Sequence, residues 1–484
     1  MTEIPIFASF FPEKPLQVNE ALPQHARGKV YADVPHRYFH NPDALKSYIR
    51  DLKKIGVNVL LLLPHFFPSF SEYIVKNFEK PCPLFGSWKV FADVMTYAES
   101  LGMDRMIDIP FNHADWQAEN LSRSWFMNAD EKGTEAGADD TDADGNIVRI
   151  NWGGYVLDNS KRELLDYWLQ KVIFPHVSQY HVNAIRIDAA WGLDPKGLSY
   201  IVKETKARFP HVWFLAENLG MARLIKLAKS GIAAGGERYF NNMYWYEKGR
   251  YIPADIHRFF KISKGKPSCS LFSSHDVLMP AMRSMATLRS KQYGKLNEKA
   301  LHRQIVEREG ITSLTQISPD EQRKIIRLMK LDFIISALLS TDVMFAAGSE
   351  KCLLERVNVL TSSPEHFNRG INSDLPSFMA TILRAKFSDT LFNTDGVIIP
   401  FGNWERDKTG CKGFIKRSST RILMTAVNTN LSQAVACPIP DKLRRANSLA
   451  ELAPDGYRLG ASQKLDSTPT LLPGQATVLY TPFS

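Results

Sequence analysis

Apolar stretches of strand length alternate with amphipathic helical stretches through about the first 390 residues of this chain of 484. Residues 42–55 carry apolar side chains at helical spacing and end at Gly56, and Val57 to Leu63 then form a continuous apolar run. We expect the first strand at residues 4–11. Strands that alternate with helices form βαβ units around a parallel sheet. The roughly seven or eight units are too many for a small doubly wound sheet, so the pattern predicts an α/β fold, a (β/α)8 TIM barrel.

The expected strands end in polar residues. Carboxylates, amides or histidines stand at four carboxyl ends, namely Asn112 with His113, Asp188, Glu217, and His275 with Asp276. Barrel enzymes place their chemistry on this face of the barrel. We therefore expect the four ends to form one shared site.

The strand expected at 182–188 carries two charged side chains near its carboxyl end. Successive side chains of a strand point to opposite faces, so Arg186 and Asp188 are expected on the face of Ala184. A charged pair there costs free energy unless it is paired or exposed at the strand end. Taken alone, this segment fits a structural ion pair as well as it fits an active site.

Carboxylates on three different strand ends suit the cleavage of glycosidic bonds. That reaction needs one carboxylic acid to protonate the leaving oxygen and one carboxylate to act at the anomeric carbon. The candidates are Asp188, Glu217 and Asp276. We expect Arg186 to lower the pKa of Asp188 and to keep that carboxylate ionised. His113 and His275 are expected to donate hydrogen bonds to sugar hydroxyls.

The strand ends resemble, in order, the four motifs of the α-amylase family of glycoside hydrolases (family 13). The matching segments are Asp108 to His113, Ala184 to Ala190, Phe214 to Asn218, and Phe272 to Asp276. The resemblance implies a TIM-barrel enzyme without a cofactor that acts on α-1,4-glucans (starch, glycogen or maltooligosaccharides). It implies a retaining hydrolase or transglycosylase that works through a covalent β-glycosyl-enzyme.

The resemblance also implies roles for individual residues. Asp188 would be the nucleophile, Glu217 the acid and base, and Asp276 the stabiliser of the transition state. The expected sugar-binding residues are Asn112, His113, Arg186, His275, Tyr73 and Trp191. Tyr73 is the tyrosine found near the position where the family has one that stacks on the sugar. Trp191 follows the nucleophile closely, and its flat face can pack on a pyranose ring.

Three parts are expected along the chain. Residues 1–393 form the catalytic barrel, and residues 114–159, whose composition is typical of loops, form a small B-type domain inserted after the third strand. After about residue 395 the pattern changes to short period-two segments separated by turns. The sequence therefore predicts a C-terminal all-β domain, a β-sandwich, over residues 394–484.

The chain differs from the family pattern at several positions. Ala184 stands where a glycine is usual, Trp191-Gly192 where Lys-His often follows the nucleophile, and Ser274 where an asparagine is usual. Other segments resemble the maltosyltransferase branch that uses maltose 1-phosphate, namely 221–231, 239–240, 244–245, 348–351 and 364–369. Two alternatives to the leading interpretation stay open: such a maltosyltransferase, and a catalytically idle barrel that binds glycans or serves as an interaction subunit.

An acidic tract at 135–146 resembles a calcium loop, with aspartates at 140, 142 and 144 before Gly145. Asn151 stands where the glutamate of such a loop would follow. We expect an exposed acidic loop and no metal site, with a structural calcium ion as the alternative.

Part of the net charge of +9 is concentrated in one segment, Arg283 to Arg308, which holds seven basic and two acidic residues. No nucleic-acid recognition motif accompanies this segment, so a solvated helical face is expected and nucleic-acid binding is not.

The five cysteines are scattered without CxxC spacing, which argues against a disulfide framework and a zinc site. The N-terminus lacks a basic, apolar leader. The most apolar later stretch, 331–348, is interrupted by Asp332 and Asp342. We expect a cytoplasmic protein that does not span a membrane, and the sequence leaves its oligomeric state open.

Overall fold

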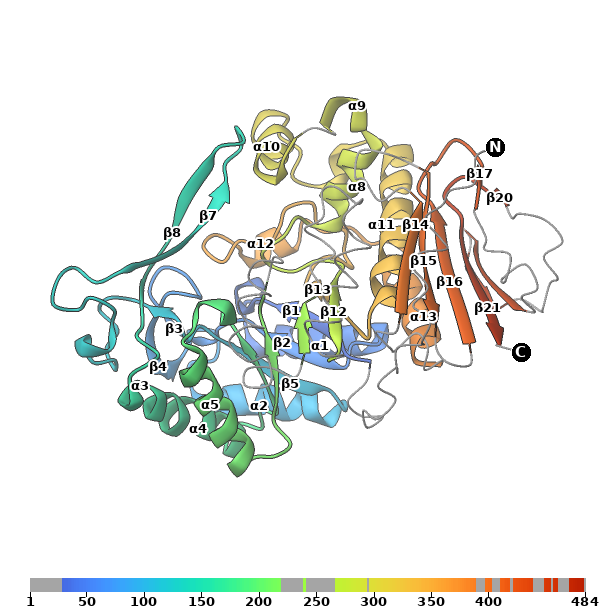
Figure 1. Ribbon diagram of the computed structural model, residues 1–484. Helices are drawn as coiled ribbons and strands as arrows, with labels where there is room; N and C mark the ends of the chain where they lie inside the picture. Colours follow the sequence, from blue (N-terminus) through green and yellow to red (C-terminus); the bar gives the residue numbers. More distant parts are fainter. Residues whose placement is uncertain are drawn as a thin grey trace.

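The computed structural model describes most of the barrel and parts of the C-terminal region. The described residues are 28–218, 238–240, 266–293, 296–388, 397–402, 410–417, 421–437, 448–453, 456–459 and 470–482. Eight parallel strands close into a barrel with the order β1-β13-β12-β11-β10-β9-β5-β2 (Figure 1). The predicted (β/α)8 barrel is confirmed.

The barrel strands are short and buried. Their bounds are β1 Val30–Val34, β2 Val59–Leu62, β5 Asp104–Ile109, β9 Ala184–Ile187, β10 Trp213–Ala216, β11 Arg238–Phe240, β12 Ser268–Leu271 and β13 Asp342–Ala346. The first strand of the closed barrel lies later in the chain than the strand expected at residues 4–11. β1 closes the barrel by pairing with β2 and β13, whereas residues 4–11 lie outside the described residues.

Helices and short helical turns connect these strands, and the longer ones cover the outside of the barrel (Figure 1). They are η2 His36–Tyr38, α1 Pro42–Ile55, α2 Trp88–Ser100, η3 Arg123–Trp125, α3 Arg162–Tyr167, the π-helix η4 Trp168–Ile173, α4 Phe174–Ser178, η5 Ala190–Gly192, α5 Pro195–Arg208, α8 Pro280–Leu288, α9 Ser290–Tyr293, α10 Glu298–His302, the π-helix η9 Arg303–Arg308, η10 Leu314–Gln316, α11 Pro319–Leu339, α12 Pro364–Phe367 and α13 Leu375–Ser388.

Local signals in the sequence explain several helix ends. The Asn41 side chain caps α1 by accepting a hydrogen bond from the Ala44 N–H at 2.9 Å. Gly56 ends the same helix with a φ of 109°, a conformation that favours glycine. Ser318 caps α11 in the same way, accepting from the Glu321 N–H at 3.2 Å.

The barrel interior is filled by side chains and is not a pore. An apolar cluster includes Tyr31, Leu61, Met106, Ala184 and Leu215. A buried ion pair joins Arg238 of β11 to Asp342 of β13, and the Tyr31 hydroxyl donates to Asp342 at 3.1 Å. The polar site described below therefore lies at the carboxyl end of a packed core.

A three-stranded antiparallel sheet is inserted between β5 and β9. It has the order β6-β8-β7, with β6 His113–Ala114, β7 Glu135–Thr141 and β8 Ile147–Val156. β7 and β8 form a long hairpin, so the loop-like structure expected for 114–159 was wrong in that part. A smaller antiparallel pair, β3 Phe66–Pro68 and β4 Val75–Pro81, follows β2.

The C-terminal region is all-β. A six-stranded sheet has the order β14-β15-β16-β21-β18-β19 and stands beside α11 and α13 (Figure 1). Its strands are β14 Val397–Gly402, β15 Cys411–Arg417, β16 Arg421–Asn428, β18 Ser448–Ala453, β19 Gly456–Leu459 and β21 Ala476–Pro482. A second sheet pairs β17 Val435–Ala436 with β20 Thr470–Leu471, and side chains of both sheets share one apolar cluster.

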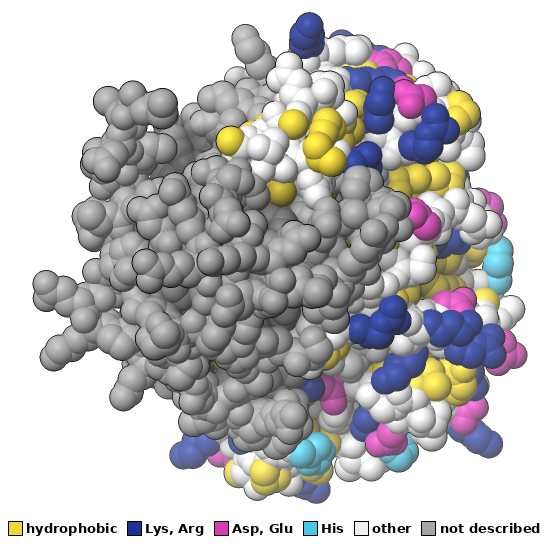
Figure 2. Space-filling model, turned by 90° about the vertical axis from the view of Figure 1, so that its right-hand side faces the viewer, with side chains coloured by type: hydrophobic (Ala, Val, Ile, Leu, Met, Phe, Trp, Pro, Cys, Tyr) yellow, Lys and Arg dark blue, Asp and Glu magenta, His cyan; other side chains and the backbone are white. Residues whose placement is uncertain are grey.

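Charged side chains of both signs are mixed on the described part of the face in Figure 2. Lysine and arginine alternate there with aspartate and glutamate, so no uniformly basic stripe of the kind that follows a nucleic-acid backbone is visible on that part. Within the described residues, no helix combines the length and the apolar character needed to cross a membrane.

Candidate active site

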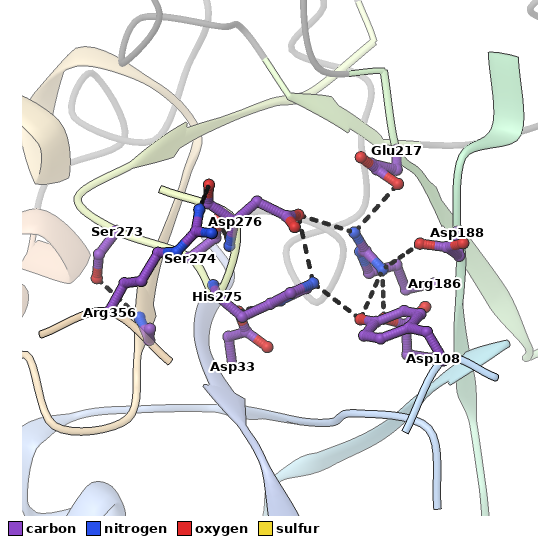
Figure 3. A network of polar contacts seen from close by, with 12 residues as sticks. Asp33, Asp108, Arg186, Asp188, Glu217, Ser273, Ser274, His275, Asp276 and Arg356 are labelled. Atoms are coloured by element: carbon purple, nitrogen blue, oxygen red, sulfur yellow. Dashed lines mark hydrogen bonds and ion pairs between the residues drawn. The ribbon is translucent and has the colours of Figure 1, made fainter. Parts of the chain in front are cut away.

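Arg186 lies at the centre of a group of acidic side chains at the carboxyl-terminal mouth of the barrel (Figure 3). Its guanidinium group pairs with Asp108 and lies 3.3 Å from Asp188 Oδ1. The other guanidinium nitrogen lies 3.2 Å from Glu217 Oε2 and 3.9 Å from Asp276 Oδ2. The three carboxylates expected at the strand ends therefore meet around one buried cation.

Strand register explains this arrangement. Asp108 of β5 and Arg186 of β9 are register partners in neighbouring parallel strands, so their side chains lie side by side within the barrel. Asp188 follows two residues after Arg186 on the same face. The side chains of Arg186 and Asp108 are fully buried and that of Glu217 nearly so, whereas the side chain of Asp276 is 40% exposed. Asp276 is thus the carboxylate of the group that solvent reaches most easily.

A backbone N–H holds the Glu217 side chain, and the side chain of the next residue, Asn218, anchors the chain to β11. The Ala189 N–H donates a hydrogen bond to Glu217 Oε2 at 2.6 Å. Ala189 adopts a left-handed conformation with φ 41° and ψ 43°, which is uncommon for a residue with a Cβ and which aims this N–H at the carboxylate. Asn218 extends the strand by exchanging two hydrogen bonds of 3.0 Å with the backbone of Phe240 in β11. The predicted acid therefore has a fixed position.

A second chain of contacts runs from Asp33 through His275 to Tyr73. Asp33 Oδ2 accepts hydrogen bonds from both the backbone N–H and the Nδ1 of His275, each at 2.8 Å. His275 Nε2 lies 2.9 Å from the Tyr73 hydroxyl and 3.3 Å from Asp276 Oδ2. Tyr73 in turn donates to Asp108 Oδ2 at 2.5 Å, and its ring stacks on His275 with centroids 5.3 Å apart.

The charge state of His275 follows from these neighbours. Burial alone would lower the pKa of His275, but Asp276 and Asp33 outweigh it and raise that pKa to about 10. Burial also raises the pKa of the Tyr73 hydroxyl well above its usual range, and the negative charge of Asp108 adds to this effect. At neutral pH an imidazolium and a protonated phenol therefore border the carboxylates.

The expectation for Asp188 was wrong in its net direction. Burial raises the pKa of Asp188 well above its usual range, and the nearby Glu217 carboxylate raises it further. Arg186 opposes both effects, as expected, but does not outweigh them. Burial likewise raises the pKa of Asp108 to about 6 against the pull of Arg186. One guanidinium serves several buried acids, so the group takes up a proton more readily than separate carboxylates would.

The remaining sequence candidates lie around this centre. Asn112 and His113 are buried and joined by a side-chain hydrogen bond, and the His113 ring lies 5.4 Å from that of Trp152. Burial lowers the pKa of His113 to about 4, so this ring is neutral at neutral pH. Trp191 is half-buried in the short helix η5, directly after the Asp188 segment.

Sequence reasoning missed two acids of the site and one capping interaction. Asp33 and Asp108 received no role, although each stands near the carboxyl end of a barrel strand, which was the available signal. Ser274, the residue that departs from the family pattern, accepts a hydrogen bond from the Asp276 N–H at 3.2 Å. Arg356 donates to the Asp276 carbonyl oxygen at 3.4 Å from outside the network. Both contacts fix the backbone of the exposed carboxylate.

The acidic tract at 135–146 forms the end of the β7–β8 hairpin. The Asp142 carboxylate accepts hydrogen bonds from the N–H groups of Asp144 and Asn146 at 2.9 and 2.8 Å, which closes the turn. Among the described residues, no group of three or more histidine, cysteine, aspartate or glutamate side chains is arranged to hold a metal ion. The absence of a metal site stays a prediction for this chain, with a structural calcium ion as its alternative.

The segments behind the maltosyltransferase resemblance are only partly visible. Residues 221–231 and 244–245 lie outside the described residues. Glu350 is buried and is held by the Tyr48 hydroxyl at 2.8 Å and by the Gly348 N–H at 3.0 Å. These two hydrogen bonds give the buried Glu350 carboxylate a structural role.

Comparison with known proteins finds solved structures that are similar in fold, but no match by sequence. No protein-family model matches the chain, and no curated protein sequence does. An α-amylase from H. orenii is 16% identical, with a TM-score of 0.64 over 94% of this chain and 99% of that one. A mutant of isomaltulose synthase from Erwinia rhapontici, in complex with its natural substrate sucrose, is 10% identical, with a TM-score of 0.68 over 96% of this chain and all of that one. Trehalose-6-phosphate hydrolase from Bacillus licheniformis is also 10% identical, with a TM-score of 0.67 over 96% and 100%. The chain thus has the fold of the α-amylases, from the barrel to the C-terminal sheets.

Proposed function

We propose that the protein is an enzyme of the α-amylase family, a retaining α-glycosidase or transglycosylase that acts on α-1,4-glucans. The observation that carries this proposal is the convergence of Asp188, Glu217 and Asp276 on Arg186 at the mouth of the barrel. The shared fold with α-amylases and with sugar-transferring enzymes supports it. A structural ion pair needs one carboxylate beside the arginine, whereas four carboxylates surround Arg186 here.

In the proposed reaction, Asp188 attacks the anomeric carbon while Glu217 protonates the departing glycosidic oxygen. The bond to the leaving sugar breaks as the bond to Asp188 forms, which gives a β-glycosyl-enzyme. Glu217, now a carboxylate, removes a proton from water or from a sugar hydroxyl that attacks the same carbon, and the bond from that carbon to Asp188 breaks and releases the Asp188 carboxylate. The proton and the charge balance over the two steps, and the anomeric configuration is retained.

The electrostatics of the site suit this cycle. The proposed reaction needs one proton on the carboxyl pair formed by Asp188 and Glu217. The raised pKa of Asp188, caused by burial and by the nearby Glu217 carboxylate, supports a pair that holds one proton, and this proton has to reside on Glu217 when Asp188 attacks. Arg186 then stabilises the remaining negative charge. Asp276, more exposed than the other two, is placed to bind hydroxyls of the incoming sugar.

The reaction can be tested with maltooligosaccharides and, separately, with maltose 1-phosphate as glycosyl donors. Product analysis distinguishes hydrolysis from transfer, and the proton NMR signal of the newly formed anomer reports retention. Release of phosphate from maltose 1-phosphate with growth of the acceptor chain would instead identify the maltosyltransferase alternative. Binding of maltooligosaccharides without turnover would favour the idle barrel.

Two isosteric variants test the assigned roles. Asp188→Asn and Glu217→Gln should each lower turnover by a factor on the order of a thousand or more, because each removes a group that forms or breaks a bond in the transition state. Asp51→Asn, on the outer face of α1 with a 57% exposed side chain, is the matched control. Full activity in both site variants would show that the mechanism is wrong.

The cellular setting is also a proposal. All five cysteines are free and buried, which suits the reducing environment of the cytoplasm. We therefore propose a cytoplasmic enzyme with an α-glucan or a maltooligosaccharide as its binding partner.

A further inference from the structure

The end of the β7–β8 hairpin contacts the helical segment that contains α10. In Figure 1 the hairpin extends away from the barrel strands and ends beside α10. Three contacts join the two: Asp140 with Lys299 at 2.8 Å, the Asp142 carbonyl oxygen with Asn297 Nδ2 at 2.6 Å, and Asp144 with Arg303 at 3.3 Å. The acidic tract and part of the basic segment noted in the sequence therefore bind each other.

The order of strands shows that this contact spans the mouth of the barrel. The hairpin follows β5, and the α10 segment follows β12. In the closed barrel, β5 and β12 are separated by three strands on either side, so they are diametrically opposite. Both excursions leave the carboxyl ends of their strands, where the site lies. A contact between them has to reach from one side of the mouth to the other.

The base of the hairpin lies directly beside the site. Trp152 of β8 packs near the His113 ring. A Cβ on Gly154 would lie 3.1 Å from His113, and a Cβ on Gly153 would lie 2.3 Å from the ring of Phe70. The glycines thus allow β8 to pass closely over the residues that follow β2 and β5. The hairpin therefore starts beside the site and ends at the segment that follows the opposite strand, β12.

We infer that the hairpin and the α10 segment form a strap, here residues 135–156 together with 297–303, that selects how a glucan enters. With the strap closed, an internal stretch of a long glucan cannot descend onto Asp188 from above. A chain end or a short oligosaccharide can still enter beside or beneath the strap. This inference rests on the proposed function and adds the class of substrate: chain ends and short maltooligosaccharides.

The contacts that hold the strap are suited to opening. Both ion pairs are exposed, with 55% of the Asp140 side chain and 70% of the Asp144 side chain accessible to solvent. Exposed pairs are weak and are screened by salt. Asn297 provides the third link, because its Nδ2 donates to the hairpin while its Oδ1 caps α10 by accepting from the Ala300 N–H at 2.9 Å.

Charge reversal tests the strap without touching the carboxylates of the site. The double variant Lys299→Glu with Arg303→Glu places like charges against Asp140 and Asp144. Adding Asp140→Lys and Asp144→Arg restores opposite charges in the reverse sense. Lys324→Glu, which disrupts an ordinary ion pair with Asp320 within α11, is the matched control.

Two measurements are made on the full chain. Hydrogen exchange of residues 135–156 should quicken by about tenfold in the charge-reversed variant, and return in the restored one, because two exposed ion pairs are lost and regained. The second measurement is the fall in average chain length of amylose per bond cleaved or transferred. The fall in chain length per bond should be small in the wild type and about tenfold larger in the charge-reversed variant. The rate on maltotriose should stay within about twofold of the wild-type rate.

The outcomes separate the two proposals. Unchanged exchange in the charge-reversed variant would show that these contacts do not hold the strap. Faster exchange with unchanged attack on amylose would show that the strap does not select substrates. If no form of the protein acts on any glucan, the proposed function fails, and the exchange data still decide whether the strap exists.

Discussion

Asp33 controls the charge of His275, and its replacement by asparagine gives a sharp test of the site. The pKa of about 10 for His275 stands roughly 3.5 above the ordinary value, which corresponds to about 5 kcal/mol of preference for the imidazolium. Two carboxylates share this effect, Asp276 at 3.3 Å and Asp33 at 2.8 Å. Because one close opposite charge shifts a pKa by about 1–3, Asp33→Asn should bring the pKa of His275 down to about 7–9.

The sign of the effect on stability follows from the raised pKa. A histidine whose pKa is raised on folding contributes its full stabilisation below its unfolded pKa and loses it as the pH rises through the folded value. In the wild type this window runs from about pH 6.5 to about pH 10. In Asp33→Asn the upper end of this pH window moves down to about pH 7–9 with the pKa of His275. Near neutral pH the variant should therefore be less stable than the wild type by about 1.4–4 kcal/mol.

The assay is the pH dependence of kcat/KM on a maltooligosaccharide, with the His275 ring titrated by NMR in parallel. Asparagine keeps an oxygen that can accept from the His275 N–H groups, so the fold should persist. The variant should lose activity on an alkaline limb with a midpoint between about pH 7 and pH 9, where the wild type keeps a charged His275. Identical profiles up to pH 9.5 in a folded variant, with the ring still protonated, would refute the role given to Asp33.

Three further results are expected. Arg186→Gln should lower the free energy of unfolding by about 3–5 kcal/mol in denaturant titrations, since it leaves buried carboxylates without their cation; a loss below about 1 kcal/mol would contradict that account. Gly348→Ala should lower the free energy of unfolding by about 1–3 kcal/mol in the same titrations, because φ is 95° and a Cβ would lie 2.1 Å from Leu353 Cδ1. Gly145→Ala, whose Cβ would meet open space, should lose only the stability that glycine gives to a left-handed backbone. Dialysis against EDTA should leave kcat and the melting temperature unchanged, since side chains supply every group the proposed reaction uses; restoration of a lost activity by Ca²⁺ alone would identify the acidic hairpin tract as a metal site after all.

The barrel could be predicted from the sequence because most of its signals are local. The helix at Pro42–Ile55 has its cap, its apolar stripe and its terminal glycine within its own residues, and its bounds agree with the prediction. The strand that ends at Glu217 is a continuous apolar run, and the strand that ends at Asp188 is interrupted only by Arg186. In each case the pattern of a few neighbouring residues determines the element, and tertiary contacts only select its place.

The elements that were missed depend on distant partners. β1 contains Asp33, which interrupts its apolar pattern and is compensated by His275 far along the chain. β11 has three residues, and its buried Arg238 is tolerated because Asp342 pairs with it. β7 consists largely of acidic and small residues of low strand propensity, and it is held by β8 and by the α10 segment.

In the candidate site, too, features set by local sequence could be predicted and features set by distant residues could not. The three carboxylates were identified from their positions at strand ends. The net direction of the Asp188 pKa was not, because it depends on how many acids share Arg186 and on how deeply they are buried. Sequence spacing reveals a neighbour such as Arg186 but does not count the competing charges from other strands.

The left-handed backbone at Ala189 has a consequence for the direction of proton transfer. Glu217 Oε2 accepts the Ala189 N–H at 2.6 Å and faces an Arg186 nitrogen at 3.2 Å. An oxygen that already accepts from two donors is a poor place for a proton, so in the proposed reaction the proton is expected on Oε1 of Glu217. A backbone N–H neither titrates nor rotates away. If Glu217 is the acid of the proposed reaction, the peptide geometry at Ala189 therefore sets which of its two oxygens carries the proton.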